Sequence, residues 1–135
     1  MQDNIFIDTN IWLYAFSDSN SNKAKIAKNL IKKSNVCLNT QILNEICFNL
    51  IKNENYTDEE ILHFVKNIYK KYDVLKIDEK TILGASLIRS EYNIKNYWDS
   101  MIISSAINNE CSIIYSDIIE SNLNIKEIKI INPFK

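Results

Sequence analysis

The sequence contains very little glycine or proline, with one residue of each among 135. Turn-rich all-β proteins and disordered chains both use these residues heavily, so their scarcity argues against both classes. The composition, with 46% hydrophobic and 24% charged residues, is that of an ordinary globular protein. A chain of this length buries one core, and we therefore expect a single domain over residues 1–135.

Cysteine is also scarce, and its pattern argues against two kinds of site. Cys37, Cys47 and Cys111 are odd in number, widely spaced and surrounded by apolar residues. Neither a disulfide framework nor a zinc knuckle has this pattern. We expect reduced, buried thiols, as in a cytoplasmic protein.

Long hydrophobic runs and an excess of basic residues are both absent. No run approaches the roughly 20 apolar residues of a membrane-spanning helix, and the start of the chain does not resemble a signal peptide. A cytoplasmic location without membrane contact is therefore expected. The formal net charge of −1 supplies no broad basic field for a nucleic acid, so a polyanionic partner would have to be held locally.

Short apolar runs alternate along the chain with segments in which apolar residues recur at helical spacing. This alternation predicts an α/β fold, a three-layer α/β/α sandwich with a mostly parallel central sheet. In such folds functional groups lie at the carboxyl ends of the strands. The expected strands span residues 4–7, 36–38, 74–77, 113–115 and 128–131, and the expected helices 11–16, 23–33, 41–51, 58–72, 79–92 and 97–108.

Polar residues mark where three of these helices begin. Thr40 and Asp78 are expected to be N-caps, because their side chains can accept hydrogen bonds from the first backbone N–H groups. Thr57, followed three residues later by Glu60, fits a capping box.

Four acidic residues stand out from their apolar surroundings. The stretch IFIDTNIW, residues 5–12, ends an apolar run on Asp8, which either caps the next helix or points into a functional site. Glu45, Asp99 and Asp117 also lie within or beside apolar runs. A favourable position near a helix N-terminus explains any one of them, whereas the four together favour a shared cation that offsets the cost of burying charge.

Carboxylate clusters are the oxygen ligands that Mg²⁺ or Mn²⁺ prefers. A metal in such a site lowers the pKa of a bound water and neutralises charge on a phosphodiester undergoing hydrolysis. It also supplies the attraction for phosphate that an acidic chain lacks. Hydrolysis of RNA or DNA is therefore the chemistry that the four acids favour.

Several segments, in order along the chain, carry a family resemblance: FIDTNIWLYAF, NEICFNLI, YWDSMIISSA, IIYSD and the terminal INPF. Together they resemble the PIN domain, and most closely the VapC-type toxin endoribonucleases of type II toxin–antitoxin systems. The resemblance implies an α/β/α metal-dependent endoribonuclease with Mg²⁺ or Mn²⁺ held by three or four acids. It also implies an RNA substrate, a cognate antitoxin protein and a homodimer.

Asp8, Glu45 and Asp99 match the acidic positions of this family, so the resemblance assigns them to metal binding and catalysis. Thr9 and Asn10 match the neighbouring polar positions, which orient ligands or the scissile phosphate.

The fourth acidic position departs from the family pattern. Close relatives carry Ser-Glu-Asp-Leu after the penultimate strand, whereas this chain carries SDIIE at residues 116–120. Asp117 is the first choice as the fourth catalytic and metal-binding acid, while Ser116 or Glu120 could share the role. Whether one or two metal ions bind stays open.

Aromatic residues and the single histidine lie near or between these motifs. Tyr97 and Trp98, which precede Asp99, either pack at the lip of the site or stack on an RNA base, and packing is the simpler interpretation. By analogy with the family, Trp12, with Leu13 and Phe16, is expected to line a groove for an antitoxin segment. His63 is expected at the surface, outside the site.

Two other functions compete with a ribonuclease. Phosphohydrolases of the haloacid dehalogenase type also begin with a strand and an aspartate, but they need a second aspartate where this chain has Asn10. A non-catalytic PIN-like interaction module is the other alternative, and the irregular segment around Asp117 favours it.

Overall fold

The computed structural model describes residues 4–17, 20–33, 35–120 and 125–135. Five strands of these residues form one sheet in the order β3-β2-β1-β4-β5, and every pair of neighbours is parallel. The strands are β1 (Asn4–Ile7), β2 (Val36–Asn39), β3 (Asp73–Leu75), β4 (Cys111–Tyr115) and β5 (Lys129–Ile131).

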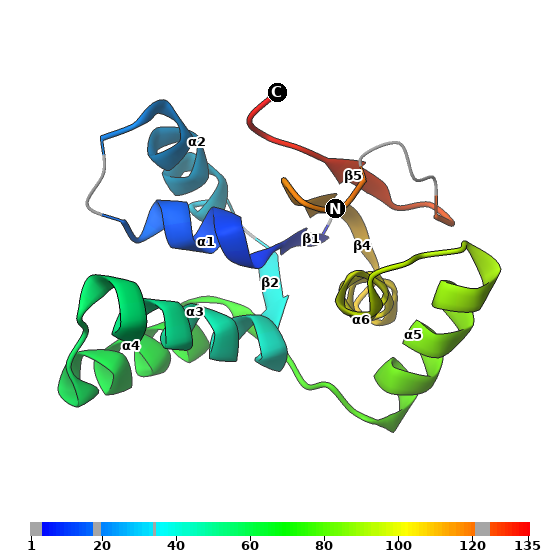
Figure 1. Ribbon diagram of the computed structural model, residues 1–135, viewed down its shortest axis with the longest axis horizontal. Helices are drawn as coiled ribbons and strands as arrows, with labels where there is room; N and C mark the ends of the chain where they lie inside the picture. The colour runs from blue at the N-terminus through cyan, green and yellow to red at the C-terminus, as the bar shows by residue number, and fades with distance from the viewer. Residues whose placement is uncertain (1–3, 18–19, 34, 121–124) are drawn as a thin grey trace.

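Helices cover both faces of this sheet, with α1 to α4 on one face and α5 and α6 on the other (Figure 1). The predicted three-layer α/β/α sandwich is therefore confirmed. None of the helices in the described ranges is long and apolar enough to cross a membrane. Their bounds are α1 (Thr9–Ala15), α2 (Asn22–Ile31), α3 (Thr40–Glu54), α4 (Asp58–Lys71), α5 (Glu79–Glu91) and α6 (Tyr97–Asn108).

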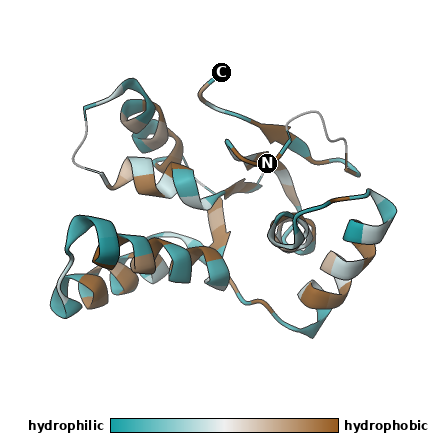
Figure 2. Ribbon diagram, in the orientation of Figure 1, coloured by the Kyte–Doolittle hydropathy of each residue, from teal (hydrophilic) through white to brown (hydrophobic). Residues whose placement is uncertain are grey.

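The central strands are hydrophobic because both of their faces are covered (Figure 2). Phe6 and Ile7 of β1, Leu38 of β2 and Ile114 of β4 are completely buried. Polar residues begin where the strands end, at Asp8, Asn39 and Ser116, and these too are buried. The packed sheet thus fixes the backbone from which the functional side chains project.

The cap of α3 differs from its prediction. Strand β2 runs one residue further than expected, so Asn39 is the N-cap and Thr40 is the first helical residue. The Asn39 Oδ1 accepts from the Ile42 N–H at 2.8 Å, and its Nδ2 donates to the Ser105 Oγ of α6 at 3.0 Å. The Asn39 side-chain amide carries both an acceptor and a donor, so it caps α3 and contacts α6 at the same time.

The other two predicted caps are confirmed, whereas α1 begins at Thr9, two residues before its predicted start. Thr57 and Glu60 form the capping box of α4, with both reciprocal hydrogen bonds present. Asp78 caps α5 by accepting from the Thr81 N–H. The third strand, in contrast, was predicted too late in the chain, because β3 pairs with β2 from Asp73 to Leu75.

The cysteines are free thiols. Cys37 and Cys111 are buried, as expected, while Cys47 is only half-buried. The Sγ atoms of Cys37 and Cys111 lie 3.3 Å apart, on the two strands that flank β1.

The single glycine, Gly84, lies in the middle of α5 where this helix packs against α6. A Cβ at this position would lie 2.6 Å from the Ser104 Oγ of α6. Ser104 is buried and donates to the Thr81 carbonyl at 2.8 Å, so its hydroxyl cannot move aside without losing that bond. Close contact between the two helices therefore requires glycine here.

Replacing Gly84 with alanine is expected to lower the free energy of unfolding by about 1–2 kcal/mol, although alanine is the better helix former. Urea denaturation measures the change. The double variant Gly84→Ala with Ser104→Ala removes the clash and should regain most of the loss. A Gly84→Ala protein as stable as the parent would contradict the packing described above.

Candidate active site

A cleft of about 240 Å³ opens at the carboxyl ends of the central strands. The chain leaves β1 toward β2 on one side and returns to β4 on the other, so this is the point where the strand order reverses. Ligands of open α/β sheets bind at such points. Polar lining residues include three acids that the sequence singled out: Asp8, Glu45 and Asp99.

Asp8 is buried, with 5% of its surface exposed, at the end of β1. Its Oδ1 accepts from the Thr9 N–H at 2.7 Å, and its Oδ2 accepts from the Ser116 hydroxyl at 2.7 Å. Burial raises the pKa of Asp8 to about 6, the two hydrogen bonds act against this rise, and the charges of Asp99 and Glu45 add to it. Asp8 is therefore both the cap of α1 and a member of the site.

Glu45 projects from α3 into the cleft and is held by two neighbours. The Thr9 hydroxyl donates to its Oε2 at 2.7 Å, and the Gln41 Nε2 donates to its Oε1 at 3.1 Å. The sequence interpretation included Thr9 but missed Gln41. The signal was present, because Gln41 stands four residues before Glu45 and so on the same helix face.

Asp99 lies in the first turn of α6, on the opposite face of the sheet from Glu45. The Asn96 side chain caps this helix by accepting from the Trp98 N–H at 2.9 Å and the Asp99 N–H at 3.4 Å. Half-burial raises the pKa of Asp99 above its ordinary value. Acids from a strand end and from two helices thus meet in one cleft.

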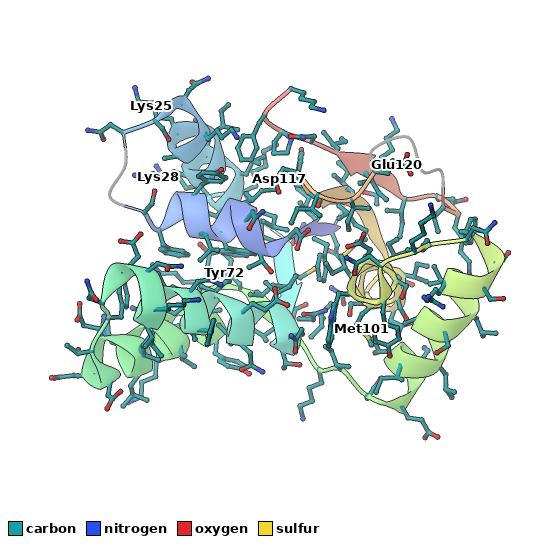
Figure 3. All side chains as sticks on the ribbon, in the orientation of Figure 1. Lys25, Lys28, Tyr72, Met101, Asp117 and Glu120 are labelled. Carbon is teal, nitrogen blue, oxygen red and sulfur yellow. The ribbon has the colours of Figure 1, made fainter. Side chains whose placement is uncertain are left out.

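The turn after β4 carries the remaining polar residues of the prediction. Ser116 is buried, donates to Asp8 and accepts from the N–H groups of Ile118 and Ile119 at 3.1 and 3.0 Å. Asp117 is half-buried and its Oδ1 accepts from the Asn10 Nδ2 at 3.3 Å, although it does not line the cleft. Glu120 is exposed, and Figure 3 shows it well apart from Asp117. Asp117 is therefore connected to the cleft through Asn10, which lines it, whereas Glu120 has no such contact among those described.

The donor set of the cleft fits a divalent cation. Asp8, Glu45 and Asp99 offer hard carboxylate oxygens, and their like charges repel one another, which a cation would relieve. No group of three potential ligands is preassembled as a metal site within the described ranges of the chain. The chemistry of the donors thus suits Mg²⁺ or Mn²⁺, while their final arrangement would depend on small side-chain movements.

The aromatic residues near the site differ from one another in exposure. Trp12 is completely buried, donates from its indole N–H to the Ile7 carbonyl at 2.9 Å, and packs edge-on against Tyr72. The prediction that Trp12 lines a partner groove is therefore wrong, because its indole belongs to the core. Of the two residues predicted with it, Leu13 is half-buried and lines the cleft, and Phe16 packs against the rings of Trp12 and Phe64. Trp98 is 51% exposed at the cleft, and His63 lies at the surface on α4.

Comparison with known proteins adds a family and several structures. The family model of the PIN domain matches residues 5–122. A chain of a toxin–antitoxin complex from Klebsiella pneumoniae has a TM-score of 0.74 at 14% identity, covering 98% of this chain and 99% of that one. VapC20 from Mycobacterium tuberculosis, a sarcin-ricin loop cleaving toxin, has a TM-score of 0.69 at 16% identity, covering 93% and 99%. A chain of DNA-bound VapBC from Salmonella typhimurium has a TM-score of 0.69 at 19% identity, covering 98% and 99%.

A comparison with curated protein sequences gives no match. At identities below 20%, the TM-scores and coverage show that this chain shares the fold of these structures over nearly its full length, and the likeness shows the fold alone.

The raised pKa of Asp8 predicts a pH dependence of stability. The folded protein holds the Asp8 proton more tightly than the unfolded chain does. Asp8 therefore does not lower the free energy of unfolding below pH 3.8, its ordinary pKa, and lowers it progressively as pH rises from there through about 6. In the presence of a chelator, the free energy of unfolding of Asp8→Asn relative to that of the parent should increase by roughly 1–3 kcal/mol from pH 5 to pH 8. Urea denaturation at the two pH values measures this difference. If the free energies of unfolding of the two proteins differ by the same amount at pH 5 and at pH 8, the burial of an ionised Asp8 is contradicted.

Proposed function

The chain belongs to the PIN domain family, and from this premise we propose that it is a Mg²⁺- or Mn²⁺-dependent endoribonuclease, the toxin of a toxin–antitoxin pair. One observation carries the proposal: Asp8, Glu45 and Asp99, from three separate elements, line one cleft at the switch point of the sheet. The fold that the chain shares with VapC toxins is consistent with it.

Asp8 and Asp99 would hold the principal metal ion, Glu45 would bind it directly or through water, and Asp117 would complete the shell. When bound, a divalent cation supplies charge neutralisation at the phosphate and lowers the pKa of a bound water. In the hydrolysis a water oxygen adds to phosphorus, one P–O ester bond breaks, and the leaving oxygen takes up a proton.

The residues of this chain hold the ligand oxygens in place for that reaction. Thr9 and Gln41 each donate to one oxygen of Glu45, so both oxygens point in fixed directions. Ser116 and the Thr9 N–H do the same for Asp8. Asn10 holds Asp117 at the edge of the site. Fixed carboxylates lower the cost of reorganisation when a phosphate binds.

A partner protein forms the second part of the proposal. The structure from Klebsiella pneumoniae with this fold is a toxin–antitoxin complex. We propose that a cognate antitoxin binds this chain and blocks its activity. A homodimer is part of the same proposal, and sedimentation velocity of the purified protein tests it.

The competing functions differ in their support. A phosphohydrolase of the haloacid dehalogenase type is disfavoured by the family match and by Asn10, whose amide donates to Asp117 where an aspartate could not. A non-catalytic module keeps the fold without turnover. Calorimetric titration with Mn²⁺ separates it from an enzyme, because an intact carboxylate site should bind the metal and an inert module should not.

Purified protein is expected to cleave unstructured RNA in Mg²⁺ or Mn²⁺ and to lose cleavage in a chelator. Asp8→Asn and Asp99→Asn should each reduce kcat/KM by at least about 100-fold, because each removes a charged oxygen ligand. His63→Ala, a change at the exposed surface of α4, is the matched control and should leave the rate unchanged. Full activity in the Asp8→Asn, Asp99→Asn double variant would refute the proposal.

The fourth acid is tested in the same assay. Asp117→Asn should slow cleavage by about 10-fold or more, since Asp117 is hydrogen-bonded to Asn10 of the cleft lining, whereas Glu120 is exposed. Glu120→Gln should have little effect. The reverse ranking would move the fourth position to Glu120.

Expression of the chain in a bacterial host is expected to stop growth. Asp8→Asn should permit growth at the same protein level, because toxicity requires cleavage, and co-expression of the product of the adjacent gene should restore growth of cells that make the unaltered chain. Growth counts and immunoblots of protein level are the measurements. Equal toxicity of the Asp8→Asn protein would show that the effect does not depend on the carboxylate site.

A further inference from the structure

The cleft has three acids and no lysine or arginine among the described residues that line it. The phosphates of a nucleic acid therefore meet no cationic side chain in this cleft. In the proposed function, the metal ion supplies the charge attraction there. Within the cleft, the rest of the affinity for a nucleic acid would come from uncharged contacts. Stacking of a base on an aromatic side chain is such a contact, worth about 1–3 kcal/mol per base.

Trp98 is the exposed aromatic residue of this cleft. It lines the cavity, 51% of its surface is exposed, and it directly precedes Asp99. Ile118, which is 59% exposed, lines the same cavity from the turn after β4. An indole left in water at such a position gives up a large burial energy, which a ligand recovers when it covers the ring.

The indole is also held in a defined position. The Trp98 backbone N–H donates to the Asn96 cap, so its Cα is fixed at the start of α6. Tyr97 packs edge-on against the indole, with ring centroids 5.6 Å apart and an interplanar angle of 76°. An edge-on neighbour supports the ring and leaves a face of it free for stacking.

We propose that Trp98 binds an unpaired nucleobase of the RNA substrate by stacking, one short step from the phosphate that is cleaved. This inference rests on the proposed ribonuclease function and adds a substrate requirement to it. Base-paired RNA keeps its bases stacked in the duplex and cannot supply one to Trp98. Flexible single strands, loops and bulges are therefore the substrate class.

The test compares intact RNA with RNA that lacks one base at a time. A short unstructured RNA is prepared with an abasic residue at each position around the cleavage point. With unaltered protein, removal of one particular base should reduce kcat/KM by about 5- to 100-fold, the range expected for one stacked base. With Trp98→Ala the intact RNA should show this same loss, and removal of that base should cause no further loss.

Two variants serve as controls. Trp98→Phe keeps an aromatic face and should retain most of the activity. Tyr69→Ala removes an equally exposed aromatic residue on α4, outside the cleft, and should change nothing. Losses from Trp98→Ala and from the abasic residue that simply multiply would overturn the proposal, because independent effects do not report a contact.

Tryptophan fluorescence gives a readout that does not need cleavage. Trp12 is completely buried, so added RNA should quench chiefly the signal of Trp98, and the abasic RNA should quench it less. Absence of wild-type cleavage would count against the proposed function, whereas this quenching reports the Trp98 contact on its own. Equal quenching by both RNAs, or no quenching, would overturn the contact. The proposal would also be overturned if acrylamide cannot quench Trp98 in the free protein and Trp98→Ala converts a dimer into monomers in sedimentation velocity, because Trp98 would then belong to a dimer interface.

Discussion

The carboxylate of Asp8, buried at the end of the central strand, is the constraint on which the site depends. A buried charge needs hydrogen-bond donors, and the donors here come from the start of α1 and from the turn after β4. Ser116 donates to Asp8 while accepting two backbone N–H groups, so the same hydroxyl also closes that turn. One acid thereby organises two loops at the switch point.

The other acids of the cleft add to the cost of the buried charge on Asp8. Glu45 and Asp99 approach from opposite faces of the sheet and add negative charge around Asp8, which raises its pKa further. Rigid helices hold them there, through the Gln41 and Thr9 contacts on one side and the Asn96 cap on the other. A fold selected for stability alone would place salt-bridging lysines here, so the concentration of acids indicates function.

Periodicity and capping chemistry predicted the layers of the fold because they depend on local spacing. The register of strand pairing and the contacts of a side chain with a distant helix do not depend on local spacing. For this reason β3 was predicted too late in the chain, and Asn39 was overlooked as the cap of α3. The acids were identifiable because charge in an apolar run is costly wherever it lies. Gln41 and the burial of Trp12 depend on which helix face meets the core, and residues 11–16 are all aliphatic or aromatic, so their spacing does not show that face.

Asn39 links the two walls of the cleft mechanically. Its amide joins the first turn of α3, which carries Glu45, to Ser105 of α6, the helix that carries Asp99. Separating the two walls would break the buried hydrogen bond between Asn39 and Ser105, at a cost of about 1–3 kcal/mol. The Asn39 side chain that caps one acid-bearing helix is thus also hydrogen-bonded to the other, so a change at Asn39 would affect the spacing of Glu45 and Asp99 as well as the start of α3.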